Sequence, residues 1–129
     1  MNGRFLVDTN IVIAFLEGDA SVQQNFAETE AIYVPSIAIG ELYYGAYRSA
    51  RVEANRTRID EFVSKYAVLV CDAVTAVVYG EIKNLLRQKG RPIPENDIWI
   101  AAVAQQYQLT LVSRDGHLRE IDTLSVETW

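Results

Sequence analysis

The sequence has 129 residues and a formal net charge of −5, with 50% hydrophobic and 22% charged residues. This length and composition fit one folded domain, which we predict over residues 1–129, and they exclude a disordered or fibrous chain. The longest apolar runs are far shorter than the ~20 residues of a membrane span. The negative charge by itself argues against a nucleic-acid ligand, because phosphate binding favours a cationic surface.

Cysteine usage and the N-terminal segment indicate a cytoplasmic protein. Cys71 is the only cysteine, so no intrachain disulfide can form, which suits a reducing compartment. Residues 1–6 contain no apolar stretch long enough for a secretory signal before the acidic Asp8. We therefore expect a cytoplasmic location without membrane association.

The first half of the chain predicts two strands and four helices. β-forming apolar residues indicate strands at residues 4–7 and 31–34. Helical spacing of apolar residues indicates helices at residues 9–17, 20–28, 36–49 and 53–65. We expect Ser36 to cap the third of these helices.

The second half predicts three more strands and two helices. The strands are expected at residues 67–70, 109–112 and 124–126. Asp72 is expected to cap one helix, and Asn96 or Asp97 to begin the other after a loop at residues 90–94. The helix after Asp72 carries an apolar stripe that we expect to face the core, formed by Val74, Val77, Val78, Ile82, Leu85 and Leu86.

The alternation of strands and helices indicates an α/β fold. The strands are continuously apolar, which is typical of a parallel sheet with helices on both faces. We predict about five strands. Because right-handed crossovers place the carboxyl ends of parallel strands at one edge, a ligand is expected to bind at that edge.

Four acids are expected at this edge. Asp8 directly follows the first strand, and Asp115 lies three residues beyond the strand that ends at residue 112. Asp97 lies in the first turn of its helix, and Glu41 in the second turn of the helix that leaves the second strand. Each of the aspartates also has an ordinary structural explanation, as a helix cap or a turn residue. Glu41 lies in a segment that is apolar on nearly every side, and one shared pocket explains all four acids together.

Four carboxylates in one pocket call for a cation. Two like charges ~4 Å apart repel by about 4 kcal/mol at an effective dielectric near 20. Hard oxygen ligands favour Mg²⁺ or Mn²⁺, and one or two ions could bind. The expected chemistry is phosphodiester hydrolysis, in which the bound ion, rather than the whole chain, supplies positive charge.

The segments that carry these acids resemble the PIN-domain ribonucleases, and most closely the VapC-type toxins of toxin–antitoxin pairs. The resemblance covers nearly the whole chain and has the family's order and spacing. It is carried by residues 6–10 (LVDTN), 34–42 (VPSIAIGEL), 94–102 (PENDIWIAA) and 111–115 (LVSRD).

The resemblance implies a three-layer α/β/α PIN fold and a Mg²⁺- or Mn²⁺-dependent endoribonuclease. It also implies a homodimer, an RNA substrate that is often tRNA, and a VapB-type antitoxin whose tail fills the active-site groove. The catalytic and metal-binding acids of the family correspond here to Asp8, Glu41, Asp97 and Asp115. Its hydroxyl and amide helpers correspond to Thr9, Asn10, Asn96 and Ser113.

Several further residues have an open role at this stage. His117 is either a general acid, an RNA contact or an ordinary loop histidine. The tyrosines at positions 43, 44 and 47 are core residues or an apolar surface for a second copy or the antitoxin. The candidates for contacts with RNA phosphates are Arg48, Arg51, Arg91 and Arg114.

Two alternative functions remain open. A structure-specific DNA nuclease would use a similar acidic pocket, and a side chain that reads the 2′-hydroxyl would distinguish RNA. A non-catalytic nucleic-acid-binding module of the same fold is the second alternative. A phospho-receiver domain fits poorly, because Asp8 has no acidic neighbour and Asp72 begins an apolar helix.

Overall fold

The computed structural model describes residues 3–129. Residues 1–2, the start of the predicted domain and of the segment examined for a signal, lie outside the described residues. None of the described helices is long and apolar enough to cross a membrane. The elements are β1 Arg4–Val7, α1 Thr9–Leu16, α2 Ala20–Glu28, β2 Ala31–Pro35, α3 Ser36–Tyr47, α4 Val52–Lys65, β3 Ala67–Leu69, α5 Ala73–Lys89, α6 Glu95–Gln106, β4 Thr110–Val112, the 3₁₀ helix η1 Gly116–Glu120 and β5 Val126–Glu127.

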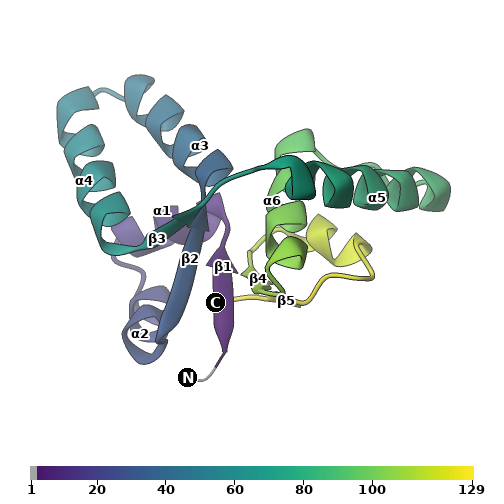
Figure 1. The fold of residues 1–129 in the computed structure, drawn as a ribbon. Coiled ribbons are helices and arrows are strands. Elements are labelled where there is room, and N and C mark those ends of the chain that lie inside the picture. The colour runs from purple at the N-terminus through teal and green to yellow at the C-terminus, as the bar shows by residue number, and fades with distance from the viewer. Residues whose placement is uncertain (1–2) are drawn as a thin grey trace.

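The five strands form one parallel sheet in the order β3-β2-β1-β4-β5. In Figure 1, α5 and α6 lie on one side of the strands, while α1 to α4 lie on the other. This arrangement confirms the predicted three-layer α/β/α fold with a central parallel sheet. It places the ends of β1 and β4 next to each other, since Val7 pairs with Val112.

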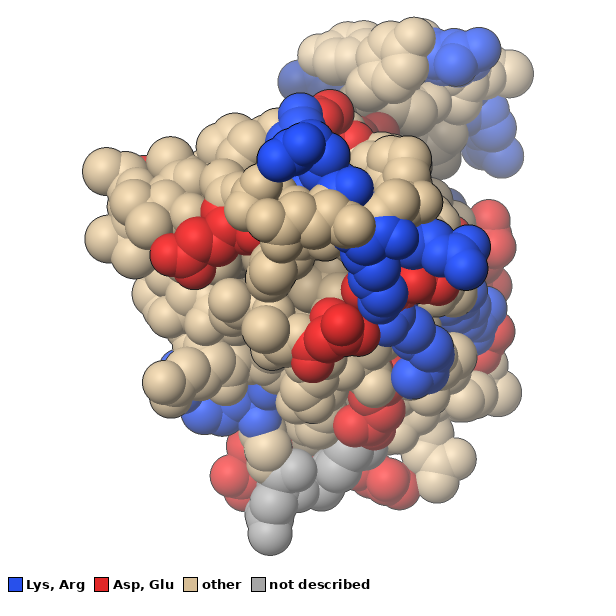
Figure 2. All heavy atoms as spheres, turned by 90° about the vertical axis from the view of Figure 1, so that its right-hand side faces the viewer, with Lys and Arg blue, Asp and Glu red and all other residues tan. Residues whose placement is uncertain are grey.

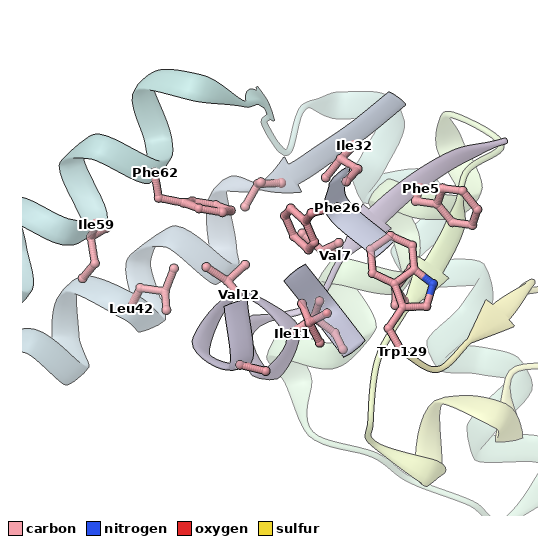
Figure 3. Packing of buried hydrophobic residues seen from close by; sticks show 14 of the residues in the cluster. Phe5, Val7, Ile11, Val12, Phe26, Ile32, Leu42, Ile59, Phe62 and Trp129 are labelled. Carbon is pink, nitrogen blue, oxygen red and sulfur yellow. The ribbon is translucent and has the colours of Figure 1, made fainter. Parts of the chain in front are cut away.

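Alternation along the strands divides the core into two layers. Phe5 and Val7 point towards the layer under α1 to α4, whereas Leu6 points towards the layer under α5 and α6. The first layer also contains Phe26 and the chain's final residue, Trp129, whose rings meet edge to face (Figure 3). A one-residue slip of β1 would exchange these layers, so the two cores fix the register that positions the residue after the strand.

The structure corrects two predicted helix starts. Ser36 is the first residue of α3, Pro35 occupies the cap position, and no side-chain cap bond forms there. Helix α6 begins at Glu95, with Pro94 at its cap, rather than at Asn96 or Asp97. Proline at this position supplies a fixed φ that suits the entry to a helix without a side-chain acceptor.

The apolar stripe of α5 is only half buried. Ile82 and Leu86 belong to the core, as expected. Val74, Val77 and Leu85 remain exposed by 57%, 63% and 49%. Helix α5 packs mainly against α6, and the side of α5 that carries these residues faces away from that contact in the described chain. The prediction that the whole stripe faces the core was therefore wrong for this single chain.

Candidate active site

Asp8 lies at the end of β1 and is the most buried of the four acids, at 2% exposure. One carboxylate oxygen accepts a hydrogen bond from the Thr9 amide at 2.8 Å, and the other from the Ser113 hydroxyl at 2.7 Å. Burial raises the pKa of Asp8, while the bonds from Ser113 and Thr9 lower it, and the nearby charges of Asp97 and Asp115 raise it further. The net direction is upward, so the site disfavours a charged Asp8 when no cation is present.

Ser113, directly after β4, connects this buried acid to its surroundings. Its hydroxyl donates to Asp8 and accepts from the Asp115 amide at 3.0 Å and from Asn10 Nδ2 at 3.4 Å. Asn10 in turn accepts from the Arg114 amide at 3.1 Å. These bonds tie the end of β1 to the turn after β4, which fixes the backbone at Asp115.

Glu41 reaches the site from α3. It accepts a hydrogen bond from the Thr9 hydroxyl at 2.9 Å, so one residue holds both Asp8 and Glu41. The neighbouring Leu42 and Ala38 are buried in the two core layers and fix this face of α3. The helix therefore presents Glu41 towards the first turn of α1.

Asp97 and Asp115 meet at the outer side of the site, together with His117. Asp97 lies in the first turn of α6, where the helix dipole favours a negative charge. His117 Nε2 lies 2.6 Å from Asp97 Oδ2 and 3.7 Å from Asp115 Oδ2. One ligand atom from each of the three side chains lies within 4.8 Å of the others.

The structure therefore brings the four predicted acids and three of the four helpers to one edge of the sheet. The fourth helper, Asn96, is exposed in the first turn of α6, beside Asp97. The donor set suits a divalent cation, because carboxylate oxygens converge there and the charges of Asp97 and Asp115 disfavour a further anion at Asp8. Among the described residues, Asp97, Asp115 and His117 form the group whose ligand atoms lie close enough to share an ion. Asp8 lies near enough to feel the charges of Asp97 and Asp115, and Thr9 links Asp8 to Glu41.

Comparison with protein-family models gives a match to the PIN domain over residues 5–124. The chain belongs to the PIN domain family. This confirms the resemblance stated from the sequence motifs. The matched range includes the four acids. It begins within β1 and ends two residues before β5.

Similar proteins support the same assignment for this PIN domain. The chain is 37% identical over 131 residues to "Ribonuclease VapC2" of Haemophilus influenzae, with 98% of each chain covered. It is 33% identical over 129 residues to "tRNA(fMet)-specific endonuclease VapC" of Shigella flexneri, again with 98% of each covered. Among solved structures, VapBC2 from Rickettsia felis bound to a promoter DNA fragment has a TM-score of 0.91 at 30% identity, covering 97% of this chain and 98% of that one.

The basic residues of this PIN domain are mostly engaged with acids or aromatic rings. Arg114 forms an ion pair with Asp19 at 2.9 Å and also donates to the Trp129 carbonyl at 3.0 Å. Arg91 lies 3.9 Å from Glu120. Arg48 lies over the ring of Tyr44. Arg51 is exposed just before α4.

The face formed by α5 and η1 shows the same mixture of charges. Blue and red side chains lie close together there in Figure 2, and Lys89 pairs with both Glu120 and Asp122. The basic run in α5 and the following loop is therefore not a uniformly positive patch. The predicted phosphate contacts at Arg48, Arg51, Arg91 and Arg114 remain predictions.

His117 is the site residue that the sequence analysis left open. It lies two residues after Asp115, and η1 turns its side chain towards Asp97 on α6. The distance of 20 residues between His117 and Asp97 hides this contact in the sequence. The only available signal was its closeness to Asp115 in a chain that contains a single histidine.

Proposed function

We propose that this chain is a metal-dependent endoribonuclease that hydrolyses RNA phosphodiester bonds, and that it is the toxin of a VapBC-type pair. The observation that carries the proposal is the gathering of Asp8, Glu41, Asp97 and Asp115 around the ends of β1 and β4. Relatives named as VapC ribonucleases support RNA as the substrate. The second of these relatives makes tRNA the first substrate to test.

The proposed cofactor is Mg²⁺ or Mn²⁺, as one ion or two. Asp8, Asp97 and Asp115 would hold it, with Glu41 at the side of the site that faces α1 and α3. A divalent cation bound there neutralises phosphate charge and lowers the pKa of water. Ser113 and Thr9 hold Asp8 through hydrogen bonds, and Thr9 also holds Glu41. In the proposed reaction Glu41 would accept a proton from the attacking water. Asn10 and Ser113 hold the turn that carries Asp115.

The proposed protein partner is a VapB-type antitoxin. Solved structures of relatives contain VapB and VapC together, which supports this partner. Ile13 lies one turn after Thr9 and Tyr44 one turn after Glu41, and these two apolar side chains are exposed by 42% and 64%. Tyr47, one turn after Tyr44 on α3, is exposed by 59%. An apolar antitoxin segment would cover these three side chains. A basic side chain of the antitoxin would then neutralise part of the negative charge of the four acids.

We further propose that residues 1–129 form one cytoplasmic domain that assembles as a homodimer. Four valines, Val68, Val70, Val74 and Val77, are exposed by 36% to 63% between β3 and the first turns of α5. We call these residues the valine surface. A second copy is the proposed occupant, because the family resemblance implies a homodimer and the exposed valines offer an apolar surface to it. Light scattering should give a dimer mass for the wild type and a monomer mass for Val74→Lys.

Side-by-side cleavage of RNA and DNA tests the catalytic proposal. Purified protein is incubated with tRNA, single-stranded RNA and DNA oligonucleotides of the same sequence, with EDTA, Mg²⁺ or Mn²⁺. We expect cleavage of RNA only, which EDTA abolishes and either ion restores. Preferential DNA cleavage would favour the alternative of a structure-specific DNA nuclease. Binding of RNA without cleavage under all conditions would favour the non-catalytic module.

A genetic test addresses the toxin role. Expression of the chain alone should arrest growth, and co-expression of the product of a neighbouring gene should relieve the arrest. Asp8→Asn serves as the inactive control, because its expression should leave growth unaffected. Growth arrest that persists in the control would contradict the link between toxicity and cleavage.

A further inference from the structure

His117 is partly exposed, but the packing of its neighbours holds it at the outer side of the acidic site. The next residue, Leu118, is fully buried in the core layer under α5 and α6, and it anchors η1. On the other side, Ile98 is 2% exposed and anchors the first turn of α6 beside Asp97. The imidazole and the carboxylate therefore face each other from two elements whose positions the core decides.

Two carboxylates converge on one nitrogen of this imidazole. The distances from His117 Nε2 to Asp97 Oδ2 and Asp115 Oδ2 are 2.6 Å and 3.7 Å. Adjacent ligands of one ion at ~2.1 Å lie roughly 3 Å apart, and opposite ligands roughly 4.2 Å apart. The 3.7 Å separation fits shared coordination, whereas the 2.6 Å contact is a hydrogen bond that must lengthen slightly when an ion binds both groups. The side chain of His117 is 36% exposed, which leaves a path for an ion to enter.

This arrangement changes the expected chemistry of the donor set. An all-oxygen set suits Mg²⁺, whereas imidazole is a ligand for transition metals and is seldom a ligand for Mg²⁺. His117 is the only histidine, so it is the one imidazole that this chain can contribute. A nitrogen donor next to two carboxylates would shift the preference of the site towards Mn²⁺ and heavier divalent ions.

We propose that His117 is a direct metal ligand, together with Asp97 and Asp115, and that it makes the site selective for Mn²⁺ over Mg²⁺. The proposal deepens the proposed function and rests on its metal site. The competing role is that of a positioning residue, in which the imidazole only hydrogen-bonds to Asp97 and never contacts the ion. The two roles differ in one measurable property, a bond between nitrogen and the metal.

Pulsed electron paramagnetic resonance of bound Mn²⁺ tests this bond directly in the untagged, full-length wild-type protein. Because the chain has one histidine, a ¹⁴N coupling typical of imidazole has a single source. We expect this coupling in the wild type and its loss in His117→Gln, which can still donate a hydrogen bond to Asp97. Isothermal titration should show a preference for Mn²⁺ over Mg²⁺ that falls roughly tenfold or more in the variant.

The outcomes separate this inference from the proposed function. Mn²⁺ bound by the wild type without an imidazole coupling would overturn the ligand role of His117 while leaving a metal-dependent nuclease intact. Failure of both ions to bind would overturn the proposed metal dependence and this inference together. The wild-type spectrum alone decides the ligand role, so the result does not depend on the folding of the variant.

Discussion

Asp8 and Asp115 follow neighbouring parallel strands, yet their environments differ. Asp8 is 2% exposed, and both of its oxygens accept hydrogen bonds from the chain. The side chain of Asp115 is 45% exposed and lies 3.7 Å from His117. The inner part of the site, around Asp8, is therefore held in place by hydrogen bonds within the protein. The outer part, formed by Asp97, Asp115 and His117, has partly exposed ligand atoms that can bind an ion. The burial that fixes Asp8 also raises its pKa, so the rigid part of the site has an energetic cost.

The largest expected effect comes from the outer part. Asp97→Asn should lower RNA cleavage by about 100-fold or more, because it removes a charged ligand while retaining the shape of the side chain. Cleavage rates and Mn²⁺ affinity measure the effect. Glu95→Gln is a matched control from the same turn of α6. Glu95 forms an ion pair with Lys83 and does not belong to the group of site acids. Equal losses in both variants would contradict the assignment of Asp97.

The next effect tests the inner part. Ser113→Ala removes the donor to Asp8 and the acceptor for Asn10 and the Asp115 amide. We expect cleavage to fall roughly 10- to 100-fold, as is typical when a residue that orients metal ligands is lost. Ser125→Ala is the control, because Ser125 lies beside β4 and contacts only the Thr110 hydroxyl at 3.4 Å among the described side-chain contacts. Unchanged cleavage in Ser113→Ala would contradict a rigid inner site.

A stability measurement in EDTA tests the cost of burying Asp8. Because its folded-state pKa is raised, the protonated carboxyl is favoured in the fold, and that stabilisation is lost as pH rises above 3.8, the usual value for an aspartate. Asp8→Asn cannot ionise, so at pH 7 it should be more stable than the wild type by about 1 kcal/mol. Urea unfolding at pH 3.5 and pH 7 measures this difference, which should disappear at the lower pH.

Addition of Mn²⁺ provides the counterpart of that experiment. The wild type should gain stability from binding the ion, whereas Asp8→Asn should gain much less. The order of stability at pH 7 should therefore reverse when EDTA is replaced by Mn²⁺. A variant that is less stable than the wild type in EDTA at pH 7 would show that the hydrogen bonds to Asp8 outweigh its burial.

The smallest effect concerns Arg114, at the rim of the site. Its ion pair with Asp19 lowers the pKa of Asp19, first through the side-chain hydrogen bond, but both side chains are partly exposed. Loss of such a pair should shift the unfolding temperature by at most a few degrees. If Arg114 contacts RNA phosphates, Asp19→Ala should release it and tighten RNA binding, whereas Arg114→Ala should weaken binding. Titration of RNA with inactive protein distinguishes these outcomes.

Local patterns were sufficient for most of the fold. Apolar strands alternating with helices predicted the parallel sheet, and the place of Asp8 and Asp115 after strands predicted their shared edge. The least reliable features were the helix starts at Ser36 and Glu95, where proline supplies the backbone geometry without a side-chain cap. The exposure of Val74 and Val77 on α5 was also missed, because an apolar stripe in the sequence does not show how much of it the rest of the fold covers.

The sequence by itself determined the α/β class, the edge at which the acids gather and the family, because these depend on the order of elements and on short motifs. Only the tertiary structure decided the surroundings of each acid. The bond from Ser113 to Asp8 and the contact of His117 with Asp97 join residues 105 and 20 positions apart. The first contact depends on the pairing of β1 with β4, and the second on the packing of η1 beside α6. Both also depend on side-chain rotamers, which no local pattern in the sequence specifies.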